Sequence, residues 1–339
     1  INIDKSREDR GDILFEHVYL YDQNRGSLVV RNGENCYLID AKGNKTADID
    51  SKYTAIYPAW DGFYKARIRK GDKKEKTKYN YLNSIGEIAF GGRIFLQAPQ
   101  FSEGKALVQN LDSSWEIIDN KGQNIGMVKG ETGKSIVTAG QFYNDRCLVQ
   151  TKEDKPEISS RPIRKFYYLN PQGEVIIDAN ESFGYLNHFN PSIFKNGVAF
   201  FQNDDQVIFF DTLGVETMIY DNISNVMNRE GDFLQLYNTS NQSIIIDRKG
   251  TQLEIPVKPS ENVMPDKIFG KYLKLYYSDR STYKRGYKYI DLSNMETACE
   301  SNARIIYILP KRLVIGSKKN PNDLYRLIDM EGKVLFEKR

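Results

Sequence analysis

Few residues of this chain have the types and spacing that catalysis requires. Its 339 residues include two histidines, His17 and His188, and a Ser-His-Asp or Cys-His arrangement would need one of them. Neither lies at a spacing from Ser, Cys or Asp that indicates such an arrangement, so we interpret both as hydrogen-bonded histidines in or beside strands. We therefore predict that the chain is not an enzyme and has no catalytic residues, no metal ligands and no cofactor.

Other reactive side chains also favour structural interpretations. Cys36, Cys147 and Cys299 are odd in number and lack the spacing of a disulfide framework or a zinc site, so we interpret them as small apolar strand residues. Residues 130–135, Gly-Glu-Thr-Gly-Lys-Ser, resemble the end of a phosphate-binding loop, but the full spacing and a following helix are missing. The many carboxylates leave open a pair that faces across a cleft, as a glycosidase needs.

Basic residues form the remaining candidate site. Four stretches, 67–78, 152–165, 280–288 and 318–321, are rich in Lys and Arg. We expect them to bind anionic groups, either an acidic glycan or an acidic protein surface; the alternative is that they are solvated loops without a ligand. The candidate ligand-binding residues are Lys70, Lys73, Lys74, Arg161, Arg164, Arg280, Lys284 and Arg285. The whole chain carries a net charge of only +3, which argues against a nucleic-acid partner.

A repeated phrase indicates which elements position these stretches. An apolar run, then Asp or Asn, two residues and Gly recurs eight times, at spacings of 36 to 51 residues. The Asp or Asn side chain can cap a type I turn, and the Gly supplies the positive φ that closes the hairpin. In the seventh copy we expect Asn294 to take the place and the conformation of Gly. The acidic or amide positions are Asp40, Asn83, Asp119, Asn170, Asp211, Asp247, Asp291 and Asp329.

Each repeat of about 41 residues contains enough apolar segments for four strands, which we name A to D. The sequence therefore predicts an all-β chain, a β-propeller of about eight four-stranded antiparallel blades. A seven-bladed propeller and an open β-solenoid of hairpin repeats remain alternatives. We expect residues 1–12 to form a flexible N-terminal tether and residues 13–339 to form a single β-repeat domain. The basic stretches then fall in B–C loops, which all leave their sheets at the same end, together with the D–A connections.

One copy of the repeat resembles a known family. Phe101-Ser102-Glu103-Gly104-Lys105-Ala106-Leu107-Val108, followed by Trp115-Glu116-Ile117-Ile118-Asp119-Asn120-Lys121-Gly122, is similar to the pattern F-x-E-G-x-A-x-V and W-G-[YF]-I-D-x-x-G of the bacterial WG-repeat (KWG repeat) family. Glu116 stands where the family has Gly, and the other copies lack this Trp, so the resemblance is to a divergent member. It implies an interaction module, often on exported or surface proteins, and no catalytic residues.

We therefore expect a non-enzymatic binding or interaction module of an exported bacterial protein, which uses the B–C loops to engage a glycan or protein partner. Two other functions stay open: a carbohydrate-active hydrolase or lyase with carboxylates in a central funnel, and a structural spacer. The polar start at Ile1 is what a removed secretory or lipoprotein signal leaves, so we expect a periplasmic or cell-surface location. No apolar run of about 18 residues predicts a membrane span. We expect Trp60 and Trp115 to pack in blade cores, although exposed they could stack on sugars.

Overall fold

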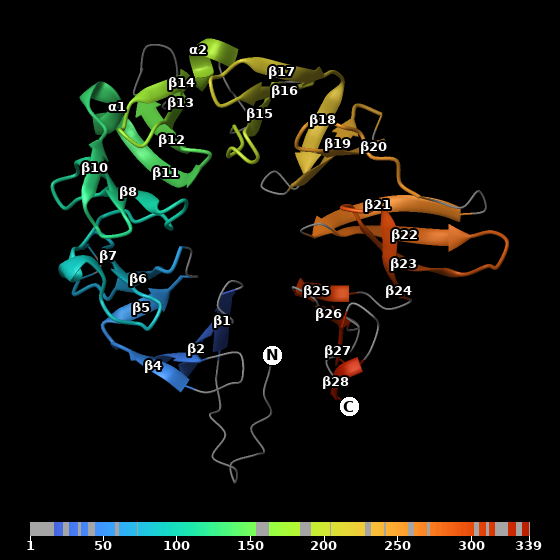
Figure 1. Ribbon diagram of the computed structural model, residues 1–339, viewed down its shortest axis with the longest axis horizontal. Helices are drawn as coiled ribbons and strands as arrows, with labels where there is room; N and C mark the ends of the chain where they lie inside the picture. The colour runs from blue at the N-terminus through green and yellow to red at the C-terminus, as the bar shows by residue number, and fades with distance from the viewer. Residues whose placement is uncertain are drawn as a thin grey trace, which may run out of the picture. The chain divides into compact units, whose positions relative to one another are not determined.

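A computed structural model gives the structure of the chain (Figure 1). It describes residues 17–22, 27–32, 35–39, 45–57, 61–72, 74–153, 163–183, 191–203, 205–227, 232–240, 242–256, 261–269, 272–301, 305–309, 312–315, 325–329 and 334–338. The predicted tether, residues 1–12, lies outside this part. The chain divides into two compact units: unit 1 comprises Ile1–Phe194 with Thr212–Gly214, and unit 2 comprises Lys195–Asp211 with Val215–Arg339.

The described part of unit 1 contains four antiparallel sheets, each with its strands paired in chain order. Sheet 1 consists of β1 (His17–Asp22), β2 (Ser27–Asn32), β3 (Asn35–Ile39) and β4 (Lys45–Ile49). Sheet 2 consists of β5 (Tyr53–Ile56), β6 (Tyr64–Ile68) and β7 (Tyr79–Leu82). Sheet 3 consists of β8 (Lys105–Gln109), β9 (Trp115–Asp119) and β10 (Asn124–Met127). Sheet 4 consists of β11 (Ile136–Tyr143), β12 (Arg146–Glu153), β13 (Ile163–Leu169) and β14 (Val175–Asp178). The short helix η2 (Phe90–Gly92) lies between sheets 2 and 3, α1 (Gly130–Ser135) lies between sheets 3 and 4, and α2 (Ala179–Phe183) follows sheet 4.

Unit 2 contains four further antiparallel sheets in its described part, again paired in chain order. Sheet 5 consists of β15 (Val198–Asn203), β16 (Gln206–Asp211) and β17 (Glu216–Tyr220). Sheet 6 consists of β18 (Ile223–Met227), β19 (Phe233–Asn238) and β20 (Ser243–Asp247). Sheet 7 consists of β21 (Glu261–Phe269), β22 (Tyr272–Asp279), β23 (Arg285–Asp291) and β24 (Glu296–Ser301). Sheet 8 consists of β25 (Ile305–Leu309), β26 (Arg312–Ile315), β27 (Tyr325–Asp329) and β28 (Val334–Lys338).

The four-strand pattern is complete in sheets 1, 4, 7 and 8, whereas sheets 2, 3, 5 and 6 have three regular strands. Sheets 2 and 6 form strands A, B and C, and sheets 3 and 5 form B, C and D. Single bridges such as Gln97↔Gln109 in sheet 3 and Ile246↔Gln252 in sheet 6 stand where the fourth strand would pair. Pro99 and Pro256 follow these bridges, and because proline has no N–H to donate, it stops the ladder from growing.

Within each unit, hydrophobic clusters lie between sheets 1 and 2, 2 and 3, 3 and 4, 5 and 6, and 6 and 7. Alternate side chains of one strand enter different clusters. In β9, Ile117 packs with residues of sheet 4, whereas Ile118 packs with Tyr81 of sheet 2. In β20, Ile246 packs with residues of sheet 5, whereas Ile245 packs with residues of sheet 7. These middle strands are therefore buried on both faces, and the period-two alternation of their side chains links sheets 3 and 6 to both neighbours.

Two predictions about core residues are confirmed. Trp115 is 1% exposed and belongs to the cluster between sheets 3 and 4. Cys36 and Cys147 are buried strand residues in such clusters. Trp60 and the side chain of Cys299 lie outside the described residues.

The C–D turn has the predicted geometry in five of the copies that the structure describes, those that begin at Asn83, Asp119, Asn170, Asp211 and Asp247. In sheet 3, Asp119 Oδ1 accepts hydrogen bonds from the N–H groups of Lys121 (2.9 Å) and Gln123 (2.8 Å). Gly122 closes the turn at φ +77°. Asn83, Asn170 and Asp247 cap their turns through the same pair of hydrogen bonds.

The prediction for Asn294 is wrong. The left-handed residue of the seventh copy is Met295, at φ +60°. The closing pair there is Asp291↔Glu296, so the loop is one residue longer than in the other copies. The positive φ belongs to the last loop residue before the closing pair, and the longer loop moves it from Asn294 to Met295.

The turn glycine also touches the preceding sheet. A Cβ atom on Gly122 would lie 2.7 Å from the ring of Phe90, which follows sheet 2. On Gly173 it would overlap the carbonyl group of Met127 in β10, at 2.5 Å from the carbonyl carbon. Three other turn glycines lie against the preceding sheet in the same way. Gly86 faces Ala47 and Ile49, Gly214 faces Ile177, and Gly250 faces Met218. The glycine therefore allows both the turn conformation and the close approach of two sheets.

The A–B turns connect neighbouring sheets of unit 1 through hydrogen bonds. Asp61 accepts one from the N–H of Gly104 at 2.8 Å. Glu103, the acidic residue of the F-x-E-G phrase, accepts two from Asn144 (2.6 Å) and Asp145 (2.9 Å) in the turn of sheet 4. These turns are two-residue hairpins with positive φ at both positions, as type I′ turns require. The acidic residue of one turn thereby satisfies backbone donors of the next.

We predict that Gly173→Ala destabilises unit 1 by about 3 kcal/mol, since the methyl group adds overlap with the Met127 backbone to the cost of a positive φ. Gly104→Ala is the matched control. Its φ is also positive, but no atom lies within 4 Å of the new methyl group, so we expect a loss of about 1 kcal/mol.

Both tryptophans, Trp60 and Trp115, belong to unit 1, so urea unfolding followed by tryptophan fluorescence measures the stability of this unit. Equal losses for the two variants would show that the close approach of the sheets contributes nothing.

Candidate binding surfaces on the B–C loops

The two ends of each sheet differ in what occupies them. In an antiparallel sheet of order A-B-C-D, the A–B and C–D turns lie at one end and the B–C loop at the other. The described A–B and C–D turns contact neighbouring sheets within their unit. The B–C loops range from two residues after β15 (204–205) to ten after β6 (69–78). Loops that vary in length on a rigid scaffold commonly carry binding residues, so the B–C loops are the place where the predicted site would lie.

The acidic side chains of the β6–β7 loop are directed at the loop itself. Asp72 Oδ1 accepts a hydrogen bond from the N–H of Lys74 at 3.1 Å, and Glu75 Oε2 accepts one from Gly71 at 3.0 Å. Glu75 also forms an ion pair with Lys78. These two donors, Lys78 first, hold the pKa of Glu75 below its usual value. The acids therefore fix the loop backbone.

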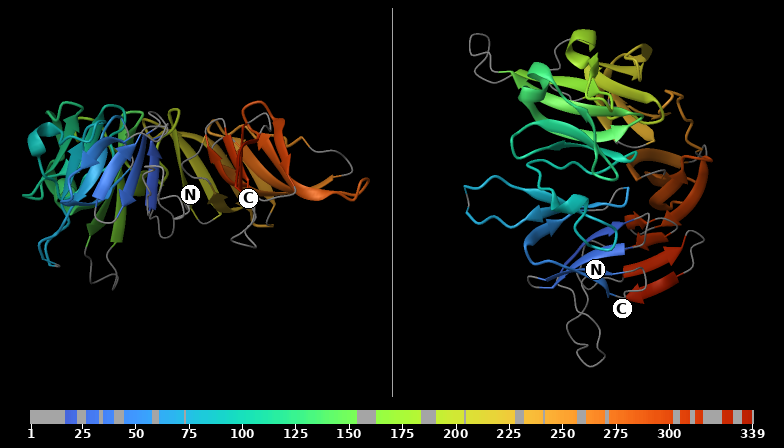
Figure 2. Two further views of the ribbon diagram at one scale, coloured as in Figure 1. Left: turned by 90° about the horizontal axis from the view of Figure 1, so that it is seen from below. Right: turned by 60° about the vertical axis from the view of Figure 1, so that its left-hand side comes forward.

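The basic residues of the same loop face solvent. Lys70 and Lys74 are exposed, as predicted, and so is Lys76, which the sequence analysis did not select. Lys73 lies outside the described residues. The loop extends beyond its sheet in both views of Figure 2. The β6–β7 loop therefore exposes several lysine ammonium groups, and hydrogen bonds within the loop hold its backbone in place.

The β12–β13 hairpin brings two cations together. Lys152 and Arg164 face each other across the ladder, and both are exposed. This part of the hairpin is therefore locally basic. Of the predicted residues in this stretch, Arg164 is placed and Arg161 lies outside the described residues.

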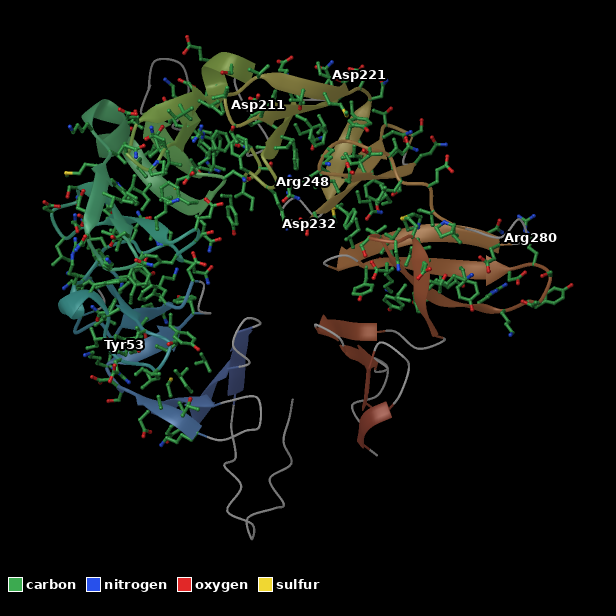
Figure 3. The ribbon with its side chains drawn as sticks, in the orientation of Figure 1. Tyr53, Asp211, Asp221, Asp232, Arg248 and Arg280 are labelled. Atoms are coloured by element: carbon green, nitrogen blue, oxygen red, sulfur yellow. The ribbon has the colours of Figure 1, made fainter. Side chains whose placement is uncertain are left out.

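The β22–β23 loop groups three predicted residues, Arg280, Lys284 and Arg285, all of them exposed. Its one carboxylate, on Asp279, accepts hydrogen bonds from Ser281 and Thr282 within the loop. The hairpin reaches past the neighbouring strands of its sheet, and Arg280 lies at its outer end (Figures 1 and 3). The tip is therefore locally cationic.

Of the predicted ligand-binding residues that the structure describes, three belong to each unit. Lys70, Lys74 and Arg164 are in unit 1, and Arg280, Lys284 and Arg285 are in unit 2. Sequence reasoning missed Tyr283, which is 89% exposed between these basic residues. Its stretch was selected for charge, and an aromatic residue there gives no signal in composition.

Buried carboxylates among the described residues are held by structural partners. Glu116, at the position of the family's glycine, pairs with Arg93 and accepts a hydrogen bond from Asn124 at 2.8 Å. Glu261 pairs with Lys288 at 2.5 Å, and their side chains are 3% and 6% exposed. Within the described part, no group of three or more His, Cys, Asp and Glu side chains is arranged to hold a metal ion. His188 and the side chain of His17 lie outside that part.

A shallow cavity of about 240 Å³ lies in unit 1, below the usual size of ligand pockets. It adjoins the contact between Gly173 and Met127, so packing of sheet 4 against sheet 3 explains it. Its lining residues are Met127, Val128, Lys129, Gln172, Gly173, Glu174 and Val175. None of the helices in the described residues has the length and hydrophobicity to cross a bilayer.

No protein-family model matches the chain, and no curated protein matches its sequence. A crystal structure described as the eukaryotic initiation factor matches with a TM-score of 0.55 and 11% identity, over 96% of this chain and 87% of that one. Weaker matches include BamB from Moraxella catarrhalis (TM-score 0.40, 12% identity, 84% of this chain and 87% of that one). Another is prolyl oligopeptidase B from Galerina marginata (TM-score 0.45, 11% identity, 94% of this chain and 56% of that one).

The predicted fold class is confirmed. In the described residues the chain is nearly all β and forms successive antiparallel sheets, and its fold is that of a β-propeller. At 11% sequence identity, the structural match supports the fold but says nothing about function. The WG-repeat resemblance and the expected export stay predictions.

Burial raises the pKa of the Cys147 thiol to about 12, against a weak opposing effect of its hydrogen bond to Gly140. At pH 8 only about one molecule in ten thousand would carry the thiolate, so we predict that iodoacetamide does not label Cys147 in the folded protein. In 6 M guanidinium chloride the thiol regains a pKa of about 8.5 and should react readily.

Peptide mapping by mass spectrometry would measure this labelling. Because the folded protein holds this proton more tightly, raising the pH above about 8.5 should progressively favour unfolding. Rapid labelling of folded Cys147 at pH 8 would contradict the prediction.

Proposed function

We propose that this chain is a non-enzymatic binding module whose B–C loops hold anionic groups of a macromolecular partner. The observation that carries the proposal is the different use of the two sheet ends. Turns such as those at Glu103 and Gly173 are committed to contacts between sheets, whereas the B–C loops contain exposed cations. Surface that does not serve packing can serve recognition.

The electrostatics of the loops support an anionic partner. Asp72 and Asp279 are bonded within their own loops, while Lys70, Lys74 and Arg280 are exposed. A nearly neutral chain therefore carries locally positive loops, which attract and orient anionic partners. The partner class comprises acidic glycans and acidic protein surfaces.

The first experiment is a binding screen of the purified protein on a glycan array and on immobilised heparin and poly-L-glutamate, at 20 mM and 150 mM NaCl. We expect binding that weakens with salt, because exposed charges are screened within about 10 Å at 0.1 M ionic strength. Absence of binding to every polyanion at 20 mM NaCl would overturn the proposal.

We predict that two charge-removing variants weaken this binding: Lys70→Ser/Lys74→Ser/Arg164→Ser in unit 1 and Arg280→Ser/Lys284→Ser/Arg285→Ser in unit 2. Three exposed ion pairs together contribute about 1–3 kcal/mol, so at least one variant should bind roughly 5- to 100-fold more weakly.

The matched control is Lys121→Ser/Lys249→Ser, which removes exposed lysines from C–D turns at the opposite sheet ends. Bio-layer interferometry would measure affinities, and thermal melting would show that each variant folds. If the control variant weakened polyanion binding as much as the two B–C loop variants, binding would depend on total charge and not on the B–C loops.

A further inference from the structure

Tyr283 lies at the end of the β22–β23 hairpin, 89% exposed and with φ +55°. A positive φ is a marked outlier for a bulky side chain. The residue before a closing pair adopts this conformation in other hairpins too, and its size varies, up to Met295 (φ +60°) in the C–D turn of the same sheet. It is Ser113 (φ +69°) in the β8–β9 loop and Gly122 in a C–D turn. Folding therefore accepts residues of different sizes at this place, and it does not require a tyrosine.

Hydrogen bonds and ring contacts hold the hairpin in place. Asp279 accepts bonds from the N–H of Ser281 (2.8 Å) and the hydroxyl of Thr282 (2.9 Å), and its own N–H bonds to the Lys284 carbonyl at 2.8 Å. Below the loop, Tyr276 and Tyr287 pair across the strands with ring centroids 5.8 Å apart. An aromatic side chain on a pre-organised loop loses little freedom on binding.

The surroundings of Tyr283 indicate the chemistry of its partner. Arg280, Lys284 and Arg285 are exposed around it. The carboxylate of Asp279 is used within the loop, and the Arg280 guanidinium contacts the neutral amide of Asn262 at 3.3 Å. Tyrosine and arginine are the residues most enriched at the energetic centres of protein interfaces. Positive charge around the ring selects acidic groups.

We propose that this group, Tyr283 with Arg280, Lys284 and Arg285 (the Tyr283 tip), binds an acidic segment of a partner protein. Tyr283 inserts between apolar groups of the partner, and the three cations pair with its carboxylates. Because Tyr283 is open to solvent on nearly all sides, a protein partner can cover both faces of its ring and bury more of its area than a sugar stacked on one face; this favours a protein over a glycan. The inference rests on the proposed function and names the partner class for one loop.

The test compares three immobilised probes at 150 mM NaCl: a random copolymer of glutamate and tyrosine, poly-L-glutamate, and heparin. We expect Tyr283→Asn to bind the copolymer at least tenfold more weakly than the unchanged protein, and Tyr283→Phe to bind it within threefold. Binding to poly-L-glutamate and heparin should change much less. Because Asn tolerates a positive φ, the melting temperature of Tyr283→Asn should be equal or higher, which separates loss of binding from loss of folding.

Leu111→Asn, which removes an exposed apolar side chain from the β8–β9 loop, is the matched control and should change nothing. If Tyr283→Asn binds the copolymer normally while Arg280→Ser/Lys284→Ser/Arg285→Ser does not, the tip acts by charge alone; the inference then fails and the proposed function stands. If Tyr283→Asn weakens heparin binding as strongly as copolymer binding, the protein-partner inference is overturned. If the unchanged protein binds no polyanion even at 20 mM NaCl, both proposals fail.

Discussion

The contact between the described turn glycines and the sheet that precedes each of them is the constraint on which the rest of the structure depends. At Gly122 and Gly173 one residue provides a positive φ and leaves room for a neighbouring ring or backbone. It thereby sets the hairpin and the distance between two sheets together. Because strands such as β9 send alternate side chains into clusters on both sides, this distance decides whether both clusters pack at the density of a protein interior. The phrase around the glycine repeats for that reason.

This constraint separates the chemistry of the two sheet ends. At the end with the A–B and C–D turns, charged groups are used in packing: Glu103 holds the next turn, and Lys105 pairs with Asp145 of the neighbouring sheet. At the B–C end, the acids Asp72 and Asp279 bond within their own loops, and the cations are left to the solvent. The β6–β7 and β22–β23 loops are therefore locally cationic, although the chain as a whole is nearly neutral.

Features with a local cause could be predicted from the sequence, and features with a tertiary cause could not. The cap at Asp119 follows from its turn alone, and a tryptophan within the repeat motif, Trp115, packs as expected. The prediction for Asn294 failed because the closing pair, which sets the loop length, depends on strand register. The predicted fourth strands of sheets 3 and 6 are reduced to single bridges before Pro99 and Pro256, and a pattern of apolar residues does not reveal this limit. Basic loops were found by composition, but Tyr283 became a candidate only through its backbone conformation and exposure.

Sheet 7 shows how a projecting loop can be held in a fixed direction. Lys274 pairs with Asp266 and lies over the ring of Tyr287, and Lys288 pairs with Glu261 and lies over the ring of Tyr277. The Lys288–Glu261 pair is buried at both ends, whereas Asp266 is 47% exposed. Removing charges from water offsets their attraction, so neither pair adds much net stability. Each pair nevertheless requires one arrangement of strands, since a register slip would leave a buried ammonium group without its carboxylate. The buried lysines thus orient the hairpin, while the cations at its end remain available to a partner.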